Sequence, residues 1–207
     1  HPLPRGHPHM SFVNALIQAV LVLVIAGVWW LIATRRRERF LPWLGLSAPR
    51  IERPARFWTL AMAALIGFSL VGLVPLNALK DTPGLAVAPF AGFGWTALPG
   101  IALWAIVQTS FTEEVFFRGL LGRTLIRAWG FSVGNSIQAL AFGVLHGLMF
   151  GPTLGWSVAV GLTLFTGAMG WLFGYLNERL AGGSILPSWG LHALSNIIAG
   201  CWAAFVW

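Results

Sequence analysis

Residues 11–34 form an apolar stretch without a single charged side chain, which ends at the basic run Arg35–Arg39. About 20 mostly apolar residues are enough for a helix that crosses the hydrocarbon core of a bilayer, and a basic run directly after them indicates a stop-transfer signal rather than a cleaved signal peptide. Hydrophobic residues make up 57% of the whole chain and charged residues only 9%, whereas soluble domains carry about 25% charged residues. The sequence therefore predicts an integral membrane protein.

Proline, glycine and charged residues separate the apolar stretches from one another. This pattern predicts an all-α membrane protein, a bundle of about six transmembrane helices in a single domain spanning residues 11–207. The expected helices are residues 11–34, 57–79, 97–128, 132–150, 154–180 and 184–207. We expect the proline-interrupted segment Arg35–Arg56 to form a loop and Lys80–Gly94 to be a poor helix former. We interpret residues 1–10, HPLPRGHPHM, as a flexible, tag-like tail outside the fold.

Basic residues are unevenly distributed between the ends of the predicted helices. Seven of the thirteen lie between Arg35 and Arg56. In a chain this apolar, such a run indicates a loop flanking the cytoplasmic face of a membrane, and we expect no nucleic-acid partner. Arg123, Arg127 and Arg179 fall on the same side as this loop if the N-terminus is outside, and Lys80 falls on the other. The positive-inside rule then predicts that both termini are outside.

The segment FTEEVFFRG places two adjacent carboxylates, Glu113 and Glu114, near the middle of the third predicted helix. An acidic residue at the centre of a membrane helix costs roughly 2.5–3.5 kcal/mol on insertion scales, so such residues normally face the bundle interior or a water-filled cavity. Neighbours on a helix point about 100° apart, and Arg118 is placed to pair with Glu114 four residues before it. Glu113 then faces elsewhere without a local cation, which makes it the better candidate for chemistry.

Two histidines occur within the predicted spans, His146 on the fourth and His192 on the sixth, and Asn196 shares a helix face with His192. Together with Glu113 they indicate a hydrolase without a protein nucleophile. Glu113 can act as general base toward water with His146 beside it, and the N–H donors of His192 and Asn196 can stabilise an oxyanion. A covalent serine or cysteine mechanism is unsupported, and Cys201 has no histidine near it in sequence.

The same side chains permit a metal alternative. Glu113, His146 and His192 could supply three ligands to a catalytic zinc with one open position. The usual helical H-E-x-x-H pair is absent from the sequence, so each ligand would have to come from a different helix. The residues alone leave both alternatives open.

Three motifs on successive helices resemble those of the CPBP intramembrane proteases, the family of the Rce1-type CAAX prenyl endopeptidases and the bacterial Abi or bacteriocin-immunity relatives. They are EExxxR at Glu113, Glu114 and Arg118, FxxxH at Phe142 and His146, and HxxxN at His192 and Asn196. Each motif is loose by itself, but their order is specific. The similarity spans residues 108–198, and residues 11–79 carry no comparable signature.

The resemblance implies hydrolysis of a peptide bond within the membrane, on a membrane-associated peptide or a lipidated protein. In this family the first Glu and the FxxxH histidine are taken to activate water, which assigns these roles to Glu113 and His146. The HxxxN pair, His192 and Asn196, is taken to form the oxyanion site, and Glu114, Arg118 and Phe142 would support it. The resemblance favours a glutamate mechanism without a metal cofactor, and a short six-span chain of this style suggests a bacterial inner membrane.

Two other functions fit the same polar residues. Some relatives in the family act through interaction, so the chain could be a non-proteolytic membrane partner, such as an immunity or scaffold protein. Intramembrane Glu and His also mark ion-coupled transporters, although the repeated halves typical of many transporters are not visible in the sequence.

The predicted helix ends also constrain how the site residues can meet. They place His146 toward the outer end of one helix and His192 toward the inner part of another, so a shared site requires tilted helices.

Overall fold

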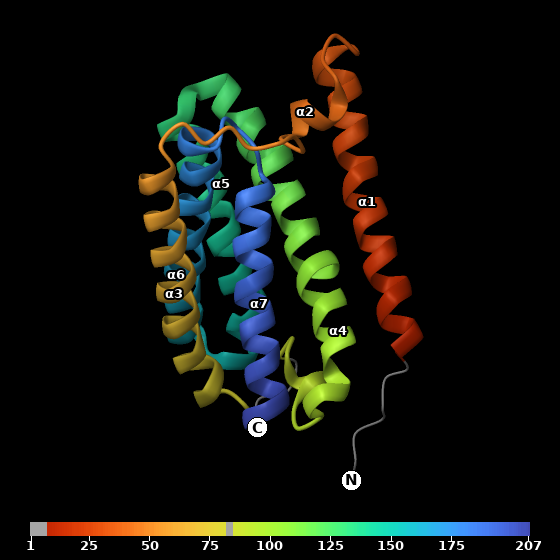
Figure 1. Ribbon diagram of the computed structural model, residues 1–207, viewed down its shortest axis with the longest axis vertical. Coiled ribbons are helices and arrows are strands. Elements are labelled where there is room, and N and C mark those ends of the chain that lie inside the picture. Colours follow the sequence, from red (N-terminus) through yellow and green to blue (C-terminus); the bar gives the residue numbers. More distant parts are fainter. Residues whose placement is uncertain (1–7, 82–84) are drawn as a thin grey trace.

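The computed structural model describes residues 8–81 and 85–207; it is 84% helical, and the described residues contain no strand. Figure 1 shows the long helices side by side in one bundle, which confirms the predicted all-α fold class. The α-helices are α1 (Pro8–Thr34), α2 (Phe40–Leu44), α3 (Pro54–Ala78), α4 (Leu98–Ala102), α5 (Arg123–Leu154), α6 (Trp156–Tyr175) and α7 (Leu186–Val206). Between or after them lie the 3₁₀ turns η1 (Ala88–Phe90) and η2 (Gly94–Ala97) and the π-helical segments η3 (Leu103–Phe111), η4 (Glu114–Gly122) and η5 (Leu176–Leu180).

The stretch from Gly94 to Leu154 is a helical hairpin rather than one straight helix. Gly130 interrupts α5 with φ 79° and ψ 168°, a backbone conformation that glycine adopts without the steric penalty of a Cβ atom. The two arms then run back along each other, and a Cβ at Gly134 would overlap the backbone of Leu125 and Ile126. The predicted break between residues 128 and 132 is therefore present. Counting the arms separately, the long helices number six in total.

Some helix ends differ from the sequence-based expectation. Phe40–Leu44 is helical where we expected a loop, because contacts from distant residues hold it. The carbonyl of Trp43 accepts hydrogen bonds from Arg123 Nε at 2.9 Å and from Arg127 Nη2 at 3.1 Å. Helix α3 begins at Pro54, three residues earlier than expected, since proline is well suited to the first helical turn. Of the expected tail, residues 8–10 belong to α1 and residues 1–7 lie outside the described part.

Most arginines gather at one end of the bundle. Figure 1 shows the start of α1 and the C-terminus at the same end, with α2 and the turn between α6 and α7 at the opposite end. At that opposite end, Arg123 donates to the carbonyl of Gly183 and pairs with Glu178 at 3.4 Å. The arrangement agrees with the expected clustering of basic residues on one side, and which side of the membrane this end faces remains a prediction.

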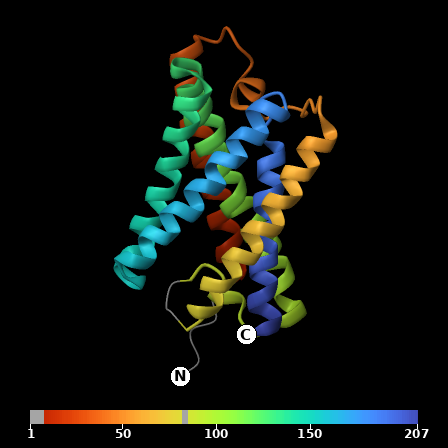
Figure 2. The same cartoon turned by 90° about the vertical axis from the view of Figure 1, so that its left-hand side faces the viewer.

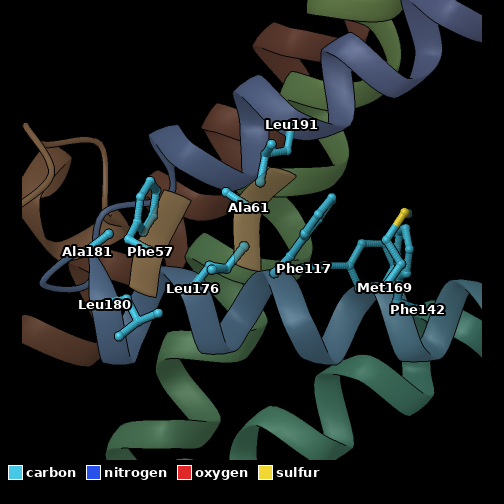
Figure 3. Packing of buried hydrophobic residues seen from close by; sticks show 10 residues of the cluster. Phe57, Ala61, Phe117, Phe142, Met169, Leu176, Leu180, Ala181 and Leu191 are labelled. Carbon is cyan, nitrogen blue, oxygen red and sulfur yellow. The ribbon is translucent and has the colours of Figure 1, made fainter. Parts of the chain in front are cut away.

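The interior of the bundle is apolar next to the polar residues singled out above. One buried cluster joins α3, η4, α5, α6, η5 and α7, and Figure 3 shows its side chains converging between these helices. Large apolar side chains also cover the outer faces, for example Ile17 and Ile32 on α1 and Leu164 on α6. Five helical stretches are long and apolar enough to cross a membrane, the hairpin counting as one. Outward-facing apolar side chains on such helices are what a lipid environment requires, so the protein is a multi-pass integral membrane protein.

Glycines let α5 and α6 approach closely. A Cβ at Gly143 would overlap the carbonyl oxygen of Thr163 and lie 3.1 Å from backbone atoms of Gly167, and a Cβ at Gly147 would lie 2.8 Å from the carbonyl oxygen of Ala159. The four-residue spacing of Gly143 and Gly147 is thus a small-xxx-small packing motif of the kind found between membrane helices. It fixes the second arm of the hairpin, which carries His146, against α6.

We expect Gly143→Ala to destabilise the folded protein by about 1–3 kcal/mol, because its methyl group has no room between α5 and α6. The measurement is the free energy of unfolding in detergent. Gly161→Ala on α6 is the matched control, since a Cβ there meets nothing within 4 Å. Equal stability of the two variants would contradict the packing described here.

Candidate active site

Glu113 lies where three helices bring polar side chains together. It is located between the π-helical segments η3 and η4, whereas His146 comes from α5 and His192 from α7. The Oε2 atom of Glu113 lies 3.9 Å from His146 Nε2 and 3.8 Å from His192 Nε2. Both distances exceed a normal hydrogen bond. The three side chains therefore lie close together without direct hydrogen bonds between them.

Both imidazoles present the same ring nitrogen to Glu113. His146 Nδ1 lies 2.8 Å from the carbonyl oxygen of Phe142, and His192 Nδ1 lies 3.0 Å from Glu114 Oε1. A carbonyl or ionised carboxylate only accepts hydrogen bonds, so each ring donates from Nδ1. The Nε2 atoms are thereby turned toward Glu113, and each histidine is oriented by a second group.

Glu114 is the most heavily bonded side chain of the site. Its carboxylate is buried, and Arg118 Nη1 lies 3.2 Å from Oε1, as the four-residue spacing predicts. Ser188 Oγ donates to Oε2 at 2.5 Å, and His192 donates to Oε1. Glu113, by contrast, keeps 25% of its side chain exposed, and its Oε2 has no hydrogen-bond partner among the described residues. The adjacent carboxylates therefore lie in different environments.

Phe142 connects two parts of the site. Its carbonyl oxygen orients His146, and its fully buried ring lies beneath the guanidinium of Arg118, with 4.2 Å between Arg118 Cζ and the ring centroid. On the same guanidinium, Arg118 Cζ lies 5.6 Å from the centroid of the Phe173 ring. Cation–π contacts of this kind are strongest away from water. They hold Arg118 against Glu114.

Asn196 reaches the same cavity but does not contact Glu113. Asn196 lies one helical turn after His192, and its Nδ2 donates to Ser110 Oγ at 3.1 Å. The cavity has a volume of about 270 Å³ and includes Glu113, His146, His192 and Asn196 in its lining. Most of its other walls are apolar side chains, among them Phe68, Leu73, Leu76, Met149, Phe165 and Met169. The predicted residues thus share one cavity, with Asn196 on its wall.

Inclined helices bring together residues that the predicted helix ends placed at different depths. Figure 2 shows α6 strongly inclined relative to α7. The π-helical geometry of η3 and η4 adds to this, because it displaces side chains from the positions of a regular α-helix. Long π-helical segments are rare and occur mostly at functional sites. Here they flank Glu113 on both sides.

Several buried polar residues of the site were not singled out from the sequence. Ser188 lies four residues before His192 on the same face of α7, so its spacing could have indicated it. Asn177 donates to Ser188 Oγ at 2.7 Å and accepts from the Ser188 backbone N–H at 3.3 Å. Asn177 and Ser110 carry no sequence signal, because each is recruited by a partner from a distant helix.

The three residues of the zinc alternative do not fit a metal ion in this arrangement. Within residues 8–81 and 85–207, no group of three His, Cys, Asp or Glu side chains has the geometry to hold one. We therefore derive no step through a metal.

Comparison with known families identifies the part of the chain that carries these residues. Residues 94–198 match the family model described as type II CAAX prenyl endopeptidase Rce1-like. The matched region begins before α4 and ends within α7, so it contains Glu113, His146, His192 and Asn196. No curated protein and no solved structure matched the chain in the corresponding searches. The family model covers half of the chain, and the chain therefore belongs to the Rce1-like family of type II CAAX prenyl endopeptidases, which makes it a CAAX-type intramembrane protease.

Proposed function

We propose that the protein is an endopeptidase that hydrolyses a peptide bond of a membrane-associated or lipidated substrate with a water activated by Glu113. The observation that carries this proposal is the unbonded Oε2 atom of Glu113, a residue of the cavity lining, which lies 3.9 Å and 3.8 Å from the Nε2 atoms of two histidines. A carboxylate with a free acceptor beside a cavity is a suitable general base for water. Glu114 cannot take this role, because its oxygens are already bonded to Arg118, Ser188 and His192.

In the proposed reaction, Glu113 removes a proton from the water while the hydroxide attacks the carbonyl carbon of the scissile peptide. The carbon–nitrogen bond then breaks, and the proton held by Glu113 passes to the leaving amine. His146 orients the water from the other side of the carboxylate, since its Nε2 is free to accept a hydrogen bond while Nδ1 donates to Phe142. No covalent enzyme intermediate is required.

The oxyanion formed by this attack needs donors on the opposite side of the substrate carbonyl. Asn196 has two N–H groups on Nδ2 and uses one for Ser110, so the other is available toward the cavity. His192 donates to Glu114 from Nδ1 and offers a second N–H from Nε2 in its imidazolium form. Fixed donors of this kind stabilise the developing charge without reorganisation, which supports the assignment of both residues to the oxyanion site.

The walls of the cavity support an apolar, membrane-borne substrate. Apart from the polar residues around Glu113, the lining is largely aromatic and aliphatic and comes from α3, α5, α6 and α7. Such walls favour a lipid-linked chain or an apolar peptide segment over a free polar peptide. A prenylated CAAX peptide is the first substrate to test, with an unmodified membrane-spanning peptide as the second, in a bacterial inner-membrane setting.

We expect Glu113→Gln to lower kcat for cleavage of the substrate peptide by about 10²–10⁴-fold, because the amide cannot accept the proton from water. The measurement is product formation by mass spectrometry with purified protein in lipid. Glu52→Gln, a carboxylate in the segment between α2 and α3, serves as the matched control and should keep full activity. Cleavage at the normal rate by the Glu113 variant would remove this residue from the mechanism.

We expect Ser188→Ala to lower both stability and turnover. The change leaves Glu114 Oε2 and Asn177 without their shared hydroxyl, and a buried polar group without a partner costs about 1–3 kcal/mol. Thermal unfolding and kcat should be measured on the same preparation. Ser157→Ala, at an exposed position of α6, should change neither quantity, and a Ser188 variant indistinguishable from it would contradict the role of this hydrogen bond.

The arginine-rich end of the bundle is expected to face the cytoplasm, with both termini outside. Single cysteines introduced into a Cys201→Ser background test this in intact bacterial cells with a thiol reagent that cannot cross the membrane. Asp81→Cys, at the end of the bundle opposite α2, should react, and Ser132→Cys, beside the Gly130 turn, should not. The reverse labelling pattern would invert the predicted orientation.

A further inference from the structure

Buried polar side chains continue behind the ion pair of Glu114 and Arg118, on the side away from the substrate cavity. Arg118, Asn135, Gln138 and Asn177 are all buried, with exposed fractions of 3% or less. Polar groups inside a membrane protein are costly unless they are bonded, and they are retained mainly where they have a function. This group therefore requires its own explanation.

The hydrogen bonds of the two α5 amides fix the orientation of each side chain. Asn135 Nδ2 donates to the carbonyl of Trp171 at 3.0 Å, and Gln138 Nε2 donates to the carbonyl of Gly170 at 3.0 Å. Gln138 Nε2 also donates to Asn135 Oδ1 at 2.9 Å. Backbone carbonyls accept only, so neither amide can be turned around. Gln138 Oε1 is consequently a fixed, buried acceptor, and it has no partner among the described residues.

Arg118, in contrast, has hydrogen-bond donors that lack an acceptor. Its ion pair with Glu114 occupies one edge of the guanidinium, and the rings of Phe142 and Phe173 contact it. Its Nε, Nη1 and Nη2 atoms are buried and have no hydrogen-bond acceptor in the described part of the chain, since Nη1 meets Glu114 only as an ion pair. A guanidinium has five N–H donors, so several of them remain to be satisfied at this side.

A small cavity lies between these groups. Its volume is about 10 Å³, and its lining includes Arg118, Asn135, Gln138, Asn177 and Glu178. A cavity needs roughly 10–15 Å³ and two to four polar partners to hold one water molecule. Two glycines of α6 keep the space open for the network: a Cβ at Gly170 would lie 3.2 Å from Arg118 Nη2, and one at Gly174 would overlap Asn135 Oδ1. These glycines thus accommodate polar side chains as well as helix packing.

We propose that this cavity binds a single water molecule that accepts a hydrogen bond from Arg118 and donates one to Gln138 Oε1. Water fits both requirements at once, because it donates and accepts, and the volume has no room for a larger ligand. The water then links the guanidinium of Arg118 to Gln138 of α5 through two hydrogen bonds. Since Arg118 holds Glu114 and Glu114 orients His192, Gln138 becomes a positioning residue for the active site; this last role rests on the proposed endopeptidase function.

The water site is tested directly by an experimental structure of the wild-type protein at about 2 Å resolution, where ordered waters are visible. We expect density for one water within hydrogen-bond distance of both Arg118 and Gln138 Oε1. A cavity without such density, or Arg118 bonded directly to Gln138, would overturn the proposal. This measurement needs no substrate and stands whether or not the protein cleaves peptides.

The positioning role is tested with Gln138→Met, which keeps a similar side-chain length but offers no amide. The matched control is Gln18→Met at an exposed position of α1. We expect kcat for cleavage of a prenylated CAAX peptide to fall about 10-fold or more with KM unchanged, because small displacements of catalytic groups reduce turnover. The control should behave like the wild type.

The outcomes separate the two proposals. A folded Gln138 variant with unchanged kcat overturns the positioning role. If that variant does not fold, the wild-type density alone decides the water site. A wild-type protein that binds the water but cleaves neither a prenylated nor an unmodified peptide contradicts the proposed function and leaves the water site supported.

Discussion

The buried carboxylate of Glu114 is the interaction on which the rest of the site depends. A charge in the membrane interior is tolerated only when it is paired and hydrogen-bonded, and Glu114 meets this condition through its ion pair with Arg118 and the hydrogen bonds from Ser188 and His192. These partners come from η4 and α7, and Phe142 of α5 and Phe173 of α6 complete the surroundings of Arg118. One buried anion thereby links four helical segments. Its neighbour Glu113 is left free to face the cavity.

The fold supplies what this arrangement requires. The turn at Gly130 returns the chain so that the second arm of the hairpin carries His146 back to the level of Glu113. The close contact of Gly143 and Gly147 with α6 fixes that arm, and π-helical segments flank Glu113 on both sides. His146 is thus carried by a helix that a separate packing feature holds in place. Preorganisation of this kind favours catalysis because the groups need not move when charge develops.

Much of this could be predicted from the sequence because it depends on local spacing. The apolar stretches give the helices, and the four-residue spacings pair Glu114 with Arg118 and place His192 and Asn196 on one face. The different environments of Glu113 and Glu114 follow from the rotation of adjacent residues about a helix. The roles assigned to the site residues remain proposals, whereas the cavity that these residues share is visible only in the structure.

Other features could not be predicted, because they arise from contacts between segments far apart in the sequence. The short helix α2 is held by Arg123 and Arg127, and Ser188 acquires its importance only once Asn177 and Glu114 lie beside it. The shared site also depends on helix tilt, which periodicity does not encode. The polar network around Gln138 could not be predicted for the same reason. A single amide in an apolar helix does not indicate which distant groups it contacts.

In the proposed mechanism, Glu113 activates the water and the donors of His192 and Asn196 receive the oxyanion. The most direct measurement is an experimental structure with a lipid-linked peptide whose scissile bond is replaced by a phosphinate, a stable analogue of the tetrahedral intermediate. We expect one phosphinate oxygen within hydrogen-bond distance of Glu113 and the other within hydrogen-bond distance of Asn196 Nδ2. A phosphinate bound in the cavity with Glu113 beyond hydrogen-bond distance of both oxygens would contradict this mechanism.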